Sequence, residues 1–511
     1  MIGLGAVVLV FLIVVAIAIY RAEPILRARV METLSNRFKG PVELGEFHVS
    51  LSRTIQVQGE GLKVYGEADP NPHQAGVQPV IAVSEFRFQA GILELLRSPM
   101  HVDTVYLKGL QLNLPPREQR QRTKGTWGHK IKIYVHEFIC EEAQLVINTA
   151  KPDKPPLEFD INHLKMNDIG PGQPLQFEAN LINPKPVGNI ASHGSFGPWQ
   201  ADSPRDTQVR GSYAFDNADL GTIKGMSGIL SSTGEYAGSL DRIIVDGTTH
   251  TPDFRVATGG HPVSLRTKFH AIVDGTSGDT YLEPVIAEFL GSSIVAQGSV
   301  LQVKNVEGHH ILLDVTIEMG RMQDLLQLGV RTDPPVMTGA VQLKTKLDLP
   351  PGDEEVPRRL KLAGSFRVSD AHFTNPKVQA KVDELSLRSQ GKPKLAKDNI
   401  PDNVPSNVSG VFTLNTGILS FSQLYFQAPG TLVMLTGRYS LDGNQFDFHG
   451  KARLDAKLSQ TVTGWKSVLL KPVDPFFHKH GAGAEVPVKI TGTQSEPHFG
   501  LDLGHNDKDK Q

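Results

Sequence analysis

Histidines at close spacing are the first residues of this chain whose types could do chemistry. His309 and His310 are adjacent in "NVEGHHILLDV", and His478 and His480 flank a lysine in "FFHKHGAG". A metal site needs three or four ligands whose orientation is held by further hydrogen bonds. Two histidine pairs on separate segments do not supply that set. We therefore interpret them as surface residues of loops and predict no metal site.

The acidic and glycine-rich stretches do not indicate a catalytic centre either. "SGDTYLEPVIAEFLG" contains Asp279, Glu283 and Glu288, whose spacing suits strand ends rather than two carboxylates of fixed geometry. The glycines between Gly221 and Gly228 lack the strand–turn–helix context that phosphate binding requires. No hydrolase, metalloprotease or dinucleotide-binding motif occurs in a fitting context. We therefore predict no catalytic residue, no cofactor and no enzymatic activity.

Composition excludes two further classes of site. The 511 residues include 52 basic and 54 acidic ones, a net charge of −2, so no basic field exists to hold nucleic acid. The single cysteine, Cys140, permits no intrachain disulfide and no cysteine-based metal site. It lies in the alternating run "KIKIYVHEFICEEAQLVI", which predicts a small buried apolar residue.

Four ten-residue stretches share one pattern and indicate how the elements are built. They are "GSYAFDNADL" from Gly211, "GSFRVSDAHF" from Gly364, "GVFTLNTGIL" from Gly410 and "GRYSLDGNQF" from Gly437. Each has an aromatic residue two positions after the glycine, and the alternation that follows places apolar side chains on one face of a strand. The polar step in each predicts a hairpin turn. The predicted turns are Asn217-Ala218, Ser369-Asp370-Ala371, Asn415-Thr416-Gly417 and Asp442-Gly443-Asn444.

This repetition predicts the fold class. We expect a mainly β protein with a few short helices: an N-terminal transmembrane helix, then a long, twisted antiparallel sheet of repeated hairpins, curled into a groove or sandwich. The predicted helices are 25–38, 91–98, Met319–Gly329 and Ser459–Lys471, and the Pro-rich stretch 389–407 is predicted as a loop. These helices are too few to cover the sheet. Its apolar face therefore packs on a second sheet or stays open, and alternation alone does not decide.

The N-terminus predicts a membrane anchor. Residues 2–20 carry no charge, and nineteen helical residues cross a hydrocarbon core of about 30 Å. The run exceeds a signal-peptide core and no basic segment precedes it, which favours an uncleaved anchor over cleavage near Ala16-Ile17-Ala18. The anchor residues are Ile2, Leu4, Val7, Val8, Leu9, Val10, Phe11, Leu12, Ile13, Val14, Val15, Ile17, Ile19 and Tyr20.

The segment after the anchor predicts both an orientation and an amphipathic helix. Basic residues from Arg21 to Lys39 follow the span and conflict with export, but long following domains translocate largely regardless of flanking charge. We therefore expect residues 21–511 to be exported. Leu26, Val30, Leu34 and Phe38 form one helical stripe, which suits packing on the protein's own domain or lying in lipid.

The order of these segments resembles AsmA-like proteins of Gram-negative bacteria. The N-terminal likeness covers the anchor, the amphipathic helix, "GPVELGEFHVSL", "IQVQGEGLKV" and "GILELLRSPMHVDTVYLKGLQLNL". "GSFGPW" resembles a turn of that family, and the C-terminal likeness covers "LTGRYSLDG", "GKARLDAKLSQTVTGWKSVLLKPVDPFF" and "AEVPVKITGTQSEPHFGLDL". On this basis we divide the chain into an anchor (1–24), an AsmA-like N-terminal region (25–150), a middle β-repeat region (151–355), an AsmA-like C-terminal region (356–504) and a polar tail (505–511).

The resemblance implies a single-pass inner-membrane protein, mostly periplasmic, that serves cell-envelope and outer-membrane biogenesis. Larger relatives resemble bridges that carry phospholipid acyl chains along an apolar β-groove, so we expect phospholipid and other envelope proteins as partners. The alternatives are a non-catalytic scaffold that holds envelope proteins and, more remotely, an envelope hydrolase. The candidate groove-facing residues are Phe412, Leu414, Tyr439, Leu441, Phe446, Phe448 and Leu454.

Overall fold

The structure is a computed structural model. It describes residues 23–36, 40–51, 54–66, 78–91, 94, 100–114, 133–147, 157–170, 172–198, 200, 203–256, 260–275, 277–303, 306, 308–330, 333–397, 403–441, 445–463, 471, 483–493 and 496–502. Several predicted features lie outside these residues, namely the anchor residues 2–20, most of the helix 91–98, the turn 442–444, His478, His480 and the tail 505–511. Among the described residues, no helix combines the length and apolar character needed to cross a membrane.

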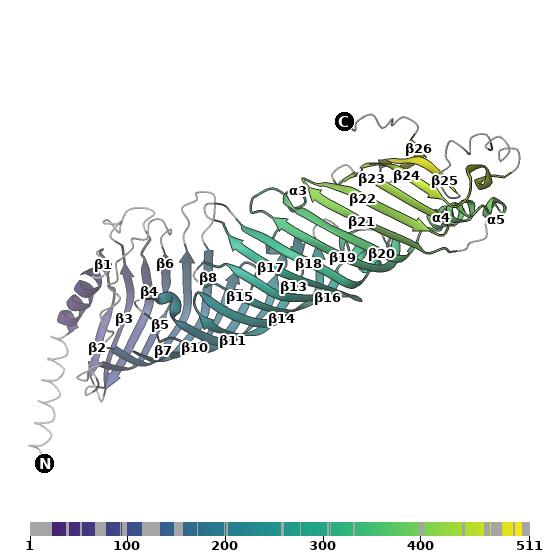
Figure 1. The fold of residues 1–511 in the computed structure, drawn as a ribbon. Helices are drawn as coiled ribbons and strands as arrows, with labels where there is room; N and C mark the ends of the chain where they lie inside the picture. The colour runs from purple at the N-terminus through teal and green to yellow at the C-terminus, as the bar shows by residue number, and fades with distance from the viewer. Residues whose placement is uncertain are drawn as a thin grey trace, which may run out of the picture. The chain divides into compact units, whose positions relative to one another are not determined.

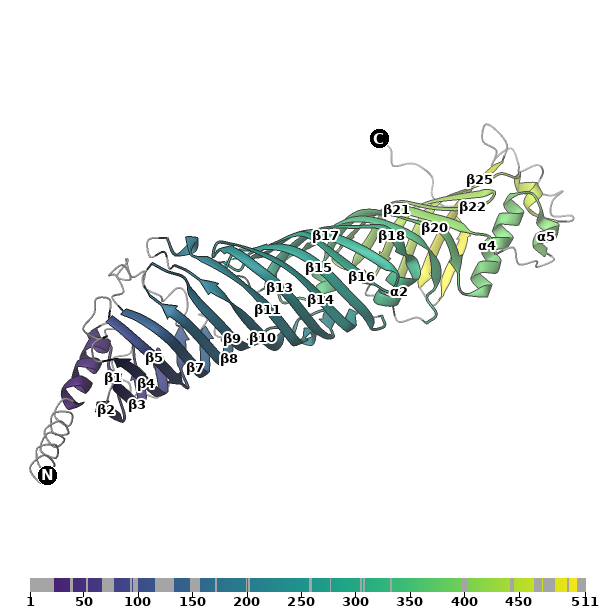
Figure 2. The same ribbon diagram turned by 90° about the horizontal axis from the view of Figure 1, so that it is seen from below.

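The described residues fall into two units and are mainly β-strands, as predicted (Figure 1). Unit 1 comprises Met1–Thr222, Leu230–Val245 and Asp274–Thr276, and unit 2 comprises Ile223–Ile229, Asp246–Val273 and Ser277–Gln511. Within each unit, consecutive strands pair side by side in a twisted layer (Figure 2).

Unit 1 holds a helix over residues 23–36 and the first strands. Its strands are β1 (Val42–Glu43), β2 (Phe47–Leu51), β3 (Thr54–Val64), β4 (Ile81–Gly91), β5 (Met100–Lys108), β6 (Gln111–Leu114), β7 (Ile133–Ile147), β8 (Leu157–Ile169), β9 (Leu175–Pro184), β10 (Val187–Phe196) and β11 (Gln208–Asp219), with nearly all of β13 (Ile229–Ser239). Short 3-10 turns, η3 (Pro204–Asp206) and η4 (Leu220–Thr222), flank β11. The predicted helix 25–38 is confirmed over its described part.

Unit 2 holds the remaining strands and the other helices, and β14 (Arg242–Val256) is divided between the units. The strands are β12 (Met226–Ser227), β15 (Val263–Val273), β16 (Thr280–Phe289), β17 (Ser292–Gln302), β18 (His309–Arg321), β19 (Met337–Leu349), β20 (Lys361–Phe373), β21 (Ser406–Asn415), β22 (Ile418–Ala428), β23 (Thr431–Ser440), β24 (Gln445–Leu454), β25 (Ala484–Thr493) and β26 (Pro497–Leu501). The helices are α2 (Met322–Gly329), α3 (Val356–Arg359), α4 (Pro376–Ser389), α5 (Pro393–Lys397) and η5 (Leu458–Thr461).

Alternation along the strands produces two different faces. In β21, Phe412 and Leu414 are buried, while Val411 and Thr413, which alternate with them, are exposed. Side chains of a strand point to opposite sides in turn, so one face gathers the apolar residues. The two-residue turn Thr416-Gly417 joins β21 to β22 with positive φ at both positions (48° and 74°). That geometry matches the right-handed twist of the flanking strands and confirms the predicted turn.

Two other predicted turns are wrong. Asn217 lies within β11 and Asp370 within β20, and each has a positive φ (55° and 52°). The pairing register shifts beside both residues, which identifies β-bulges inside continuous strands. Asn and Asp tolerate the left-handed conformation of a bulge as readily as that of a turn, so residue type alone does not separate the two.

Register explains the repeated glycine and aromatic pair. In β20 and β21, Gly364 lies opposite Phe412 and Phe366 lies opposite Gly410. Each ring therefore covers the backbone of a glycine on the next strand, and a Cβ on Gly410 would lie 3.0 Å from Phe366 Cε1. The repeated pattern places rings where the neighbouring strand has no side chain.

One pairing departs from the predicted antiparallel order. β7 runs parallel to β5 and β6, with Val105 opposite Phe138 and Leu112 opposite Leu145. Parallel neighbours need a long connection between them, and residues 115–132 separate β6 from β7 in the sequence. Strand alternation carries no information on direction, so the sequence pattern did not predict this.

Each unit has its own small buried cluster. In unit 1, Leu44, Phe47, Val83 and Phe86 are buried together, and Met31 of helix 23–36 packs against them. In unit 2, Ile317, Val341, Val368 and Ala371 are buried, with Met322 and Leu325 of α2 against them. A third cluster, Ala452, Leu454 and Val486, packs against Leu458 of η5.

Helix α4 was not predicted from the sequence. The Asn375 side chain accepts a hydrogen bond from Lys377 N (2.9 Å) and Pro376 occupies the first turn. Buried Asp383 accepts from Val404 N (3.0 Å), and Ser386 Oγ donates to Pro429 O (2.8 Å). The Asn-Pro pair is a helix-start signal, so it could have revealed this helix. The predicted loop 389–407 likewise contains the short helix α5, which lies beside α4 (Figure 2).

Candidate functional site

The candidate site is one face of unit 2, which we call the inner face. Hydrogen-bonded register connects its residues into rows that cross β15 to β25. The first row is Ala271, Leu282, Gly298, Leu313, Leu347, Leu362, Leu414, Leu419, Tyr439, Phe446 and Gly492. The second row is Phe269, Val285, Ala296, Val315, Thr345, Gly364, Phe412, Phe421, Gly437, Phe448 and Ile490.

Charge separates the two sides of these strands. Neither row contains an Asp, Glu, Lys, Arg or His, although together they cross eleven strands. The opposite side, which we call the outer face, carries the ionisable residues; on β24 these are Asp447, His449, Lys451 and Arg453. A surface that long without charge offers no site for an ionic ligand and favours apolar contacts.

Burial shows that most of this uncharged surface is not a closed core. Apart from Ala271, Phe412, Leu414 and Phe448, both rows are only half-buried. Two sheets that pack face to face interdigitate their inner side chains and exclude water from them. The described residues of unit 2 do not cover the two rows in that way, so apolar area remains accessible along the inner face.

One end of the strands is covered. There Ile317, Val341 and Val368 are buried beneath α2. A buried carboxylate holds α2 in place: Asp324 accepts hydrogen bonds from Gly291 N (3.0 Å), Ser292 Oγ (2.7 Å) and Arg321 Nε (2.9 Å). α4 packs on β20 and β23, and η5 packs on β24, at the same end of their strands. The inner face is therefore covered along one margin and open along the rest.

Aromatic rings line the open part. Phe412 and Phe421 lie 6.5 Å apart between ring centroids, and Phe421 and Phe448 lie 5.8 Å apart across Gly437. Phe446 and Tyr439 continue the series, with stacked rings 5.1 Å apart. Gly437 lies opposite both Phe421 and Phe448, so its missing side chain lets the two rings meet. Most of these rings are inclined to one another, at 48° for Phe412 with Phe421 and for Phe421 with Phe448, and together they form a continuous apolar series across four strands.

The predicted groove-facing residues can now be placed. Phe412, Leu414, Tyr439, Phe446 and Phe448 lie in the two rows. Leu454 lies on the same side at the covered end, where η5 packs on it. Leu441 follows the end of β23 and is 38% exposed. The prediction missed Phe366 and Phe421, whose strands have the same alternation and could have been included on that signal.

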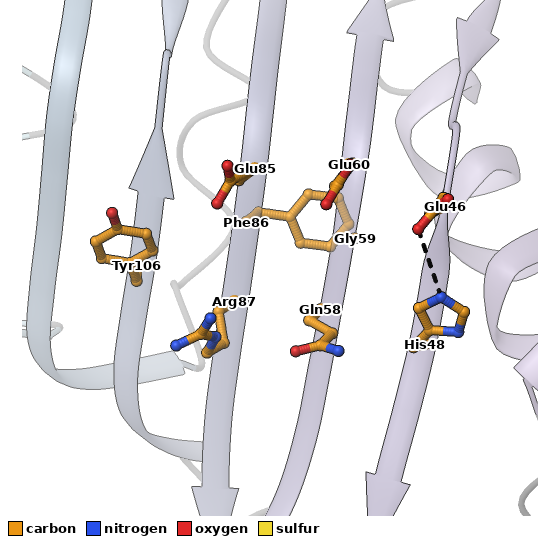
Figure 3. Close-up of a pocket in the computed structure, with 9 residues that line it drawn as sticks. All are labelled: Glu46, His48, Gln58, Gly59, Glu60, Glu85, Phe86, Arg87 and Tyr106. Atoms are coloured by element: carbon orange, nitrogen blue, oxygen red, sulfur yellow. Dashed lines mark ion pairs between the residues drawn. The ribbon is translucent and has the colours of Figure 1, made fainter.

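A polar depression lies in unit 1 (Figure 3). It has a volume of about 140 Å³ and is lined by Glu46, His48, Gln58, Gly59, Glu60, Glu85, Phe86, Arg87 and Tyr106 of β2 to β5 and the segment before β2. His48 Nε2 lies 3.7 Å from a Glu46 carboxylate oxygen, and the Phe86 ring lies over Gly59 (Figure 3). Glu60 lies directly opposite Glu85 on the neighbouring strand.

The electrostatics of this depression do not indicate catalysis. Tyr106 donates a hydrogen bond to Glu141 (2.8 Å), and this bond raises the pKa of the Tyr106 hydroxyl. A phenol with a raised pKa is a poorer proton donor near neutral pH. The described residues contain no group of three histidine, cysteine or acidic side chains placed to hold a metal ion.

The other residues that the sequence analysis considered for chemistry are either paired with a neighbour, exposed on a strand or buried, and they do not come together in one site. His310 Nε2 on β18 lies 2.7 Å from Asp348 Oδ1 on the neighbouring strand β19. Asp279 accepts a hydrogen bond from Gln302 N (2.8 Å). Glu283 and Glu288 are exposed on β16. Cys140 is fully buried, and burial raises the pKa of its thiol to about 11, which leaves little reactive thiolate.

Comparisons of the chain with family models, with curated proteins and with solved structures found no match.

Proposed function

We propose that this protein is a membrane-anchored protein of the bacterial cell envelope, and that its inner face binds phospholipid acyl chains in support of outer-membrane biogenesis. The observation that carries the proposal is the uncharged inner face, whose side chains are mostly only half-buried. Acyl chains need apolar area and no ionic partner, and each buried CH₂ contributes about 0.8 kcal/mol. The two rows supply such area over eleven strands.

Two features of the sequence support the membrane setting. Residues 2–20 carry no charge and are long enough to span a bilayer. The order of segments at both ends of the chain resembles AsmA-like proteins, which implies an inner-membrane anchor and a periplasmic sheet. The proposed place of action is therefore the periplasmic side of the inner membrane.

Photocrosslinking tests whether lipid contacts the inner face. The full chain is expressed in a Gram-negative host with benzoyl-phenylalanine at one position of β22. Phe421 is the inner-face position, and Tyr425 on the outer face of the same strand is the matched aromatic control. After irradiation of cells, mass spectrometry of the purified protein identifies attached phospholipid.

We expect phospholipid adducts at residue 421 and few at residue 425. A second variant, Phe446→Lys, places a charge among the rings and should reduce co-purifying phospholipid, whereas Val411→Lys on the outer face should not. Equal adducts at both positions would indicate contact with the membrane surface instead. Protein adducts at residue 421 without lipid would favour the scaffold function and overturn the proposal.

A further inference from the structure

Helix 23–36 packs on the first strands of unit 1, and its contacts with the described residues lie along one side. Glu23 lies 3.6 Å from His48 Nδ1, and Arg27 Nη2 donates to Leu44 O (2.5 Å). Further along, Met31 packs against the buried cluster that includes Leu44. These contacts fix the orientation of the helix relative to β2.

Two neighbouring apolar side chains in its first turns are exposed. Ile25, on the side away from these contacts, is 65% exposed, and Leu26, the first residue of the stripe, is 42% exposed, whereas Val30 and Leu34 of that stripe are half-buried. The apolar stripe is therefore exposed at Leu26, and it packs against unit 1 only from Val30 onward. Ile25 and Leu26 together offer a small exposed apolar surface to whatever lies beside the helix.

The chain itself indicates what this surface meets. The uncharged run 2–20 ends three residues before Glu23, the first described residue of the helix. Around the helix, residues 21–39 contain five basic residues against two acidic ones. An exposed basic side chain beside exposed apolar ones complements an anionic lipid surface. Arg29 is exposed near Ile25 and forms only a solvent-exposed ion pair with Glu32 (3.8 Å), which leaves it accessible to lipid phosphate.

We infer that the first two turns of helix 23–36 lie in the membrane interface, with Ile25 and Leu26 inserted at the level between headgroups and acyl chains. This inference rests on the proposed membrane anchor. The bilayer then contacts the helix on its apolar side while β2 holds it on the other. Unit 1 is thereby fixed against the membrane surface instead of moving freely on a tether.

Fluorescence quenching in vesicles tests this contact. Variants of the full chain with one added cysteine, Ile25→Cys, Val187→Cys or Leu12→Cys, are labelled with bimane and reconstituted into phosphatidylcholine vesicles with a minority of phosphatidylglycerol. Buried Cys140 does not label, because its thiol is inaccessible and its pKa is about 11. Val187 of unit 1, 45% exposed, is the apolar control outside the helix, and Leu12 reports on the anchor.

Lipids that carry bromine next to the headgroup should quench the label at residue 25 about threefold more than the label at residue 187. Equal quenching at residues 25 and 187 would overturn the inference. The label at residue 12 tests the anchor separately: without quenching by bromine deep in the acyl chains, the spanning segment of the proposed function fails. Quenching at residue 25 alone would support an interfacial helix without a span.

Discussion

The covered and open parts of the inner face contain the same kinds of residue, yet only the covered part is a core. Ile317 and Leu313 lie four residues apart on the same side of β18, but Ile317 is 1% exposed beneath α2 and Leu313 is half-buried. The difference lies in what packs above each residue, not in the strand. An apolar sheet face becomes a core only where another element covers it, and elsewhere it stays available to an apolar ligand.

Alanine substitutions on β18 test this comparison and carry the largest expected effect. Ile317→Ala leaves a cavity beneath α2 and should lower the free energy of unfolding of unit 2 by about 4 kcal/mol. Leu313→Ala removes side-chain area that is already partly in water and should cost about 1 kcal/mol. Urea denaturation measures both. Equal losses would mean that the open part is packed as tightly as the covered part, and the comparison would fail.

Removal of the Asp324 carboxylate tests what holds α2 over the inner face. Asp324→Ala leaves the Gly291 amide and the Ser292 hydroxyl without their acceptor at a buried position. Because buried donors without partners lose their full solvation, we expect a loss of about 3 kcal/mol. Hydrogen exchange should become faster in α2 while α4 stays protected. Unchanged protection of α2 would show that Met322 and Leu325 hold the helix by themselves.

A substitution at Gly437 tests the open part. An added Cβ would lie 2.7 Å from Phe448 Cα, so β23 and β24 would have to separate. We expect Gly437→Ala to cost about 2 kcal/mol through overpacking and to reduce lipid adducts at residue 421. Gly329→Ala is the matched control, because no atom lies within 4 Å of its added Cβ. Adducts that persist in a destabilised Gly437→Ala protein would show that lipid does not depend on the aromatic series.

The fold class could be predicted because alternation is a local property. In β24, Phe446 and Phe448 alternate with Asp447 and His449, and this pattern fixes which side chains share a face. Other features depend on partners far away in the sequence. The parallel pairing of β5 with β7 follows from how the chain returns, and the bulges at Asn217 and Asp370 use residues that also suit turns.

For the candidate site, too, the sequence predicted which residues share a face but not what packs on that face. Alternation placed Phe412, Tyr439 and Phe446 on one face. It did not show whether that face was covered, because burial depends on α2, α4 and η5, which reach only one end of the strands. The position of α2 over the inner face depends on the hydrogen bond from Ser292 to Asp324. These residues are 32 apart in the sequence, and no local pattern connects them.

The outer face of β24 should respond to pH near neutrality, whereas the only titratable side chain in the two rows is the phenol of Tyr439, whose pKa burial raises above its ordinary value of 10.0. His449 Nδ1 lies 2.7 Å from Asp502 Oδ2, just beyond edge strand β26, and Nε2 lies 3.1 Å from Asp447 Oδ1. The hydrogen bond with Asp502, and then that with Asp447, raises the pKa of His449 above its ordinary value of 6.5. A raised pKa means that the bonds stabilise the fold fully below pH 6.5 and are lost as pH rises through the folded-state pKa.

Hydrogen exchange of β26 measures this smallest effect. Because the His449 side chain is about one-third exposed, we expect a loss of below about 1 kcal/mol in local stability between pH 5.5 and 8.5, after correction for the intrinsic exchange rate. Lys489 lies directly opposite His449 on β25, and Arg438 lies opposite Asp447 on β23. His449→Gln should make β26 protection independent of pH, while β21, which carries no ionisable side chain, stays unaffected in either protein. If the pH dependence persists in His449→Gln, another group causes it. The hydrogen bond between His449 and Asp502 would then not be what stabilises β26.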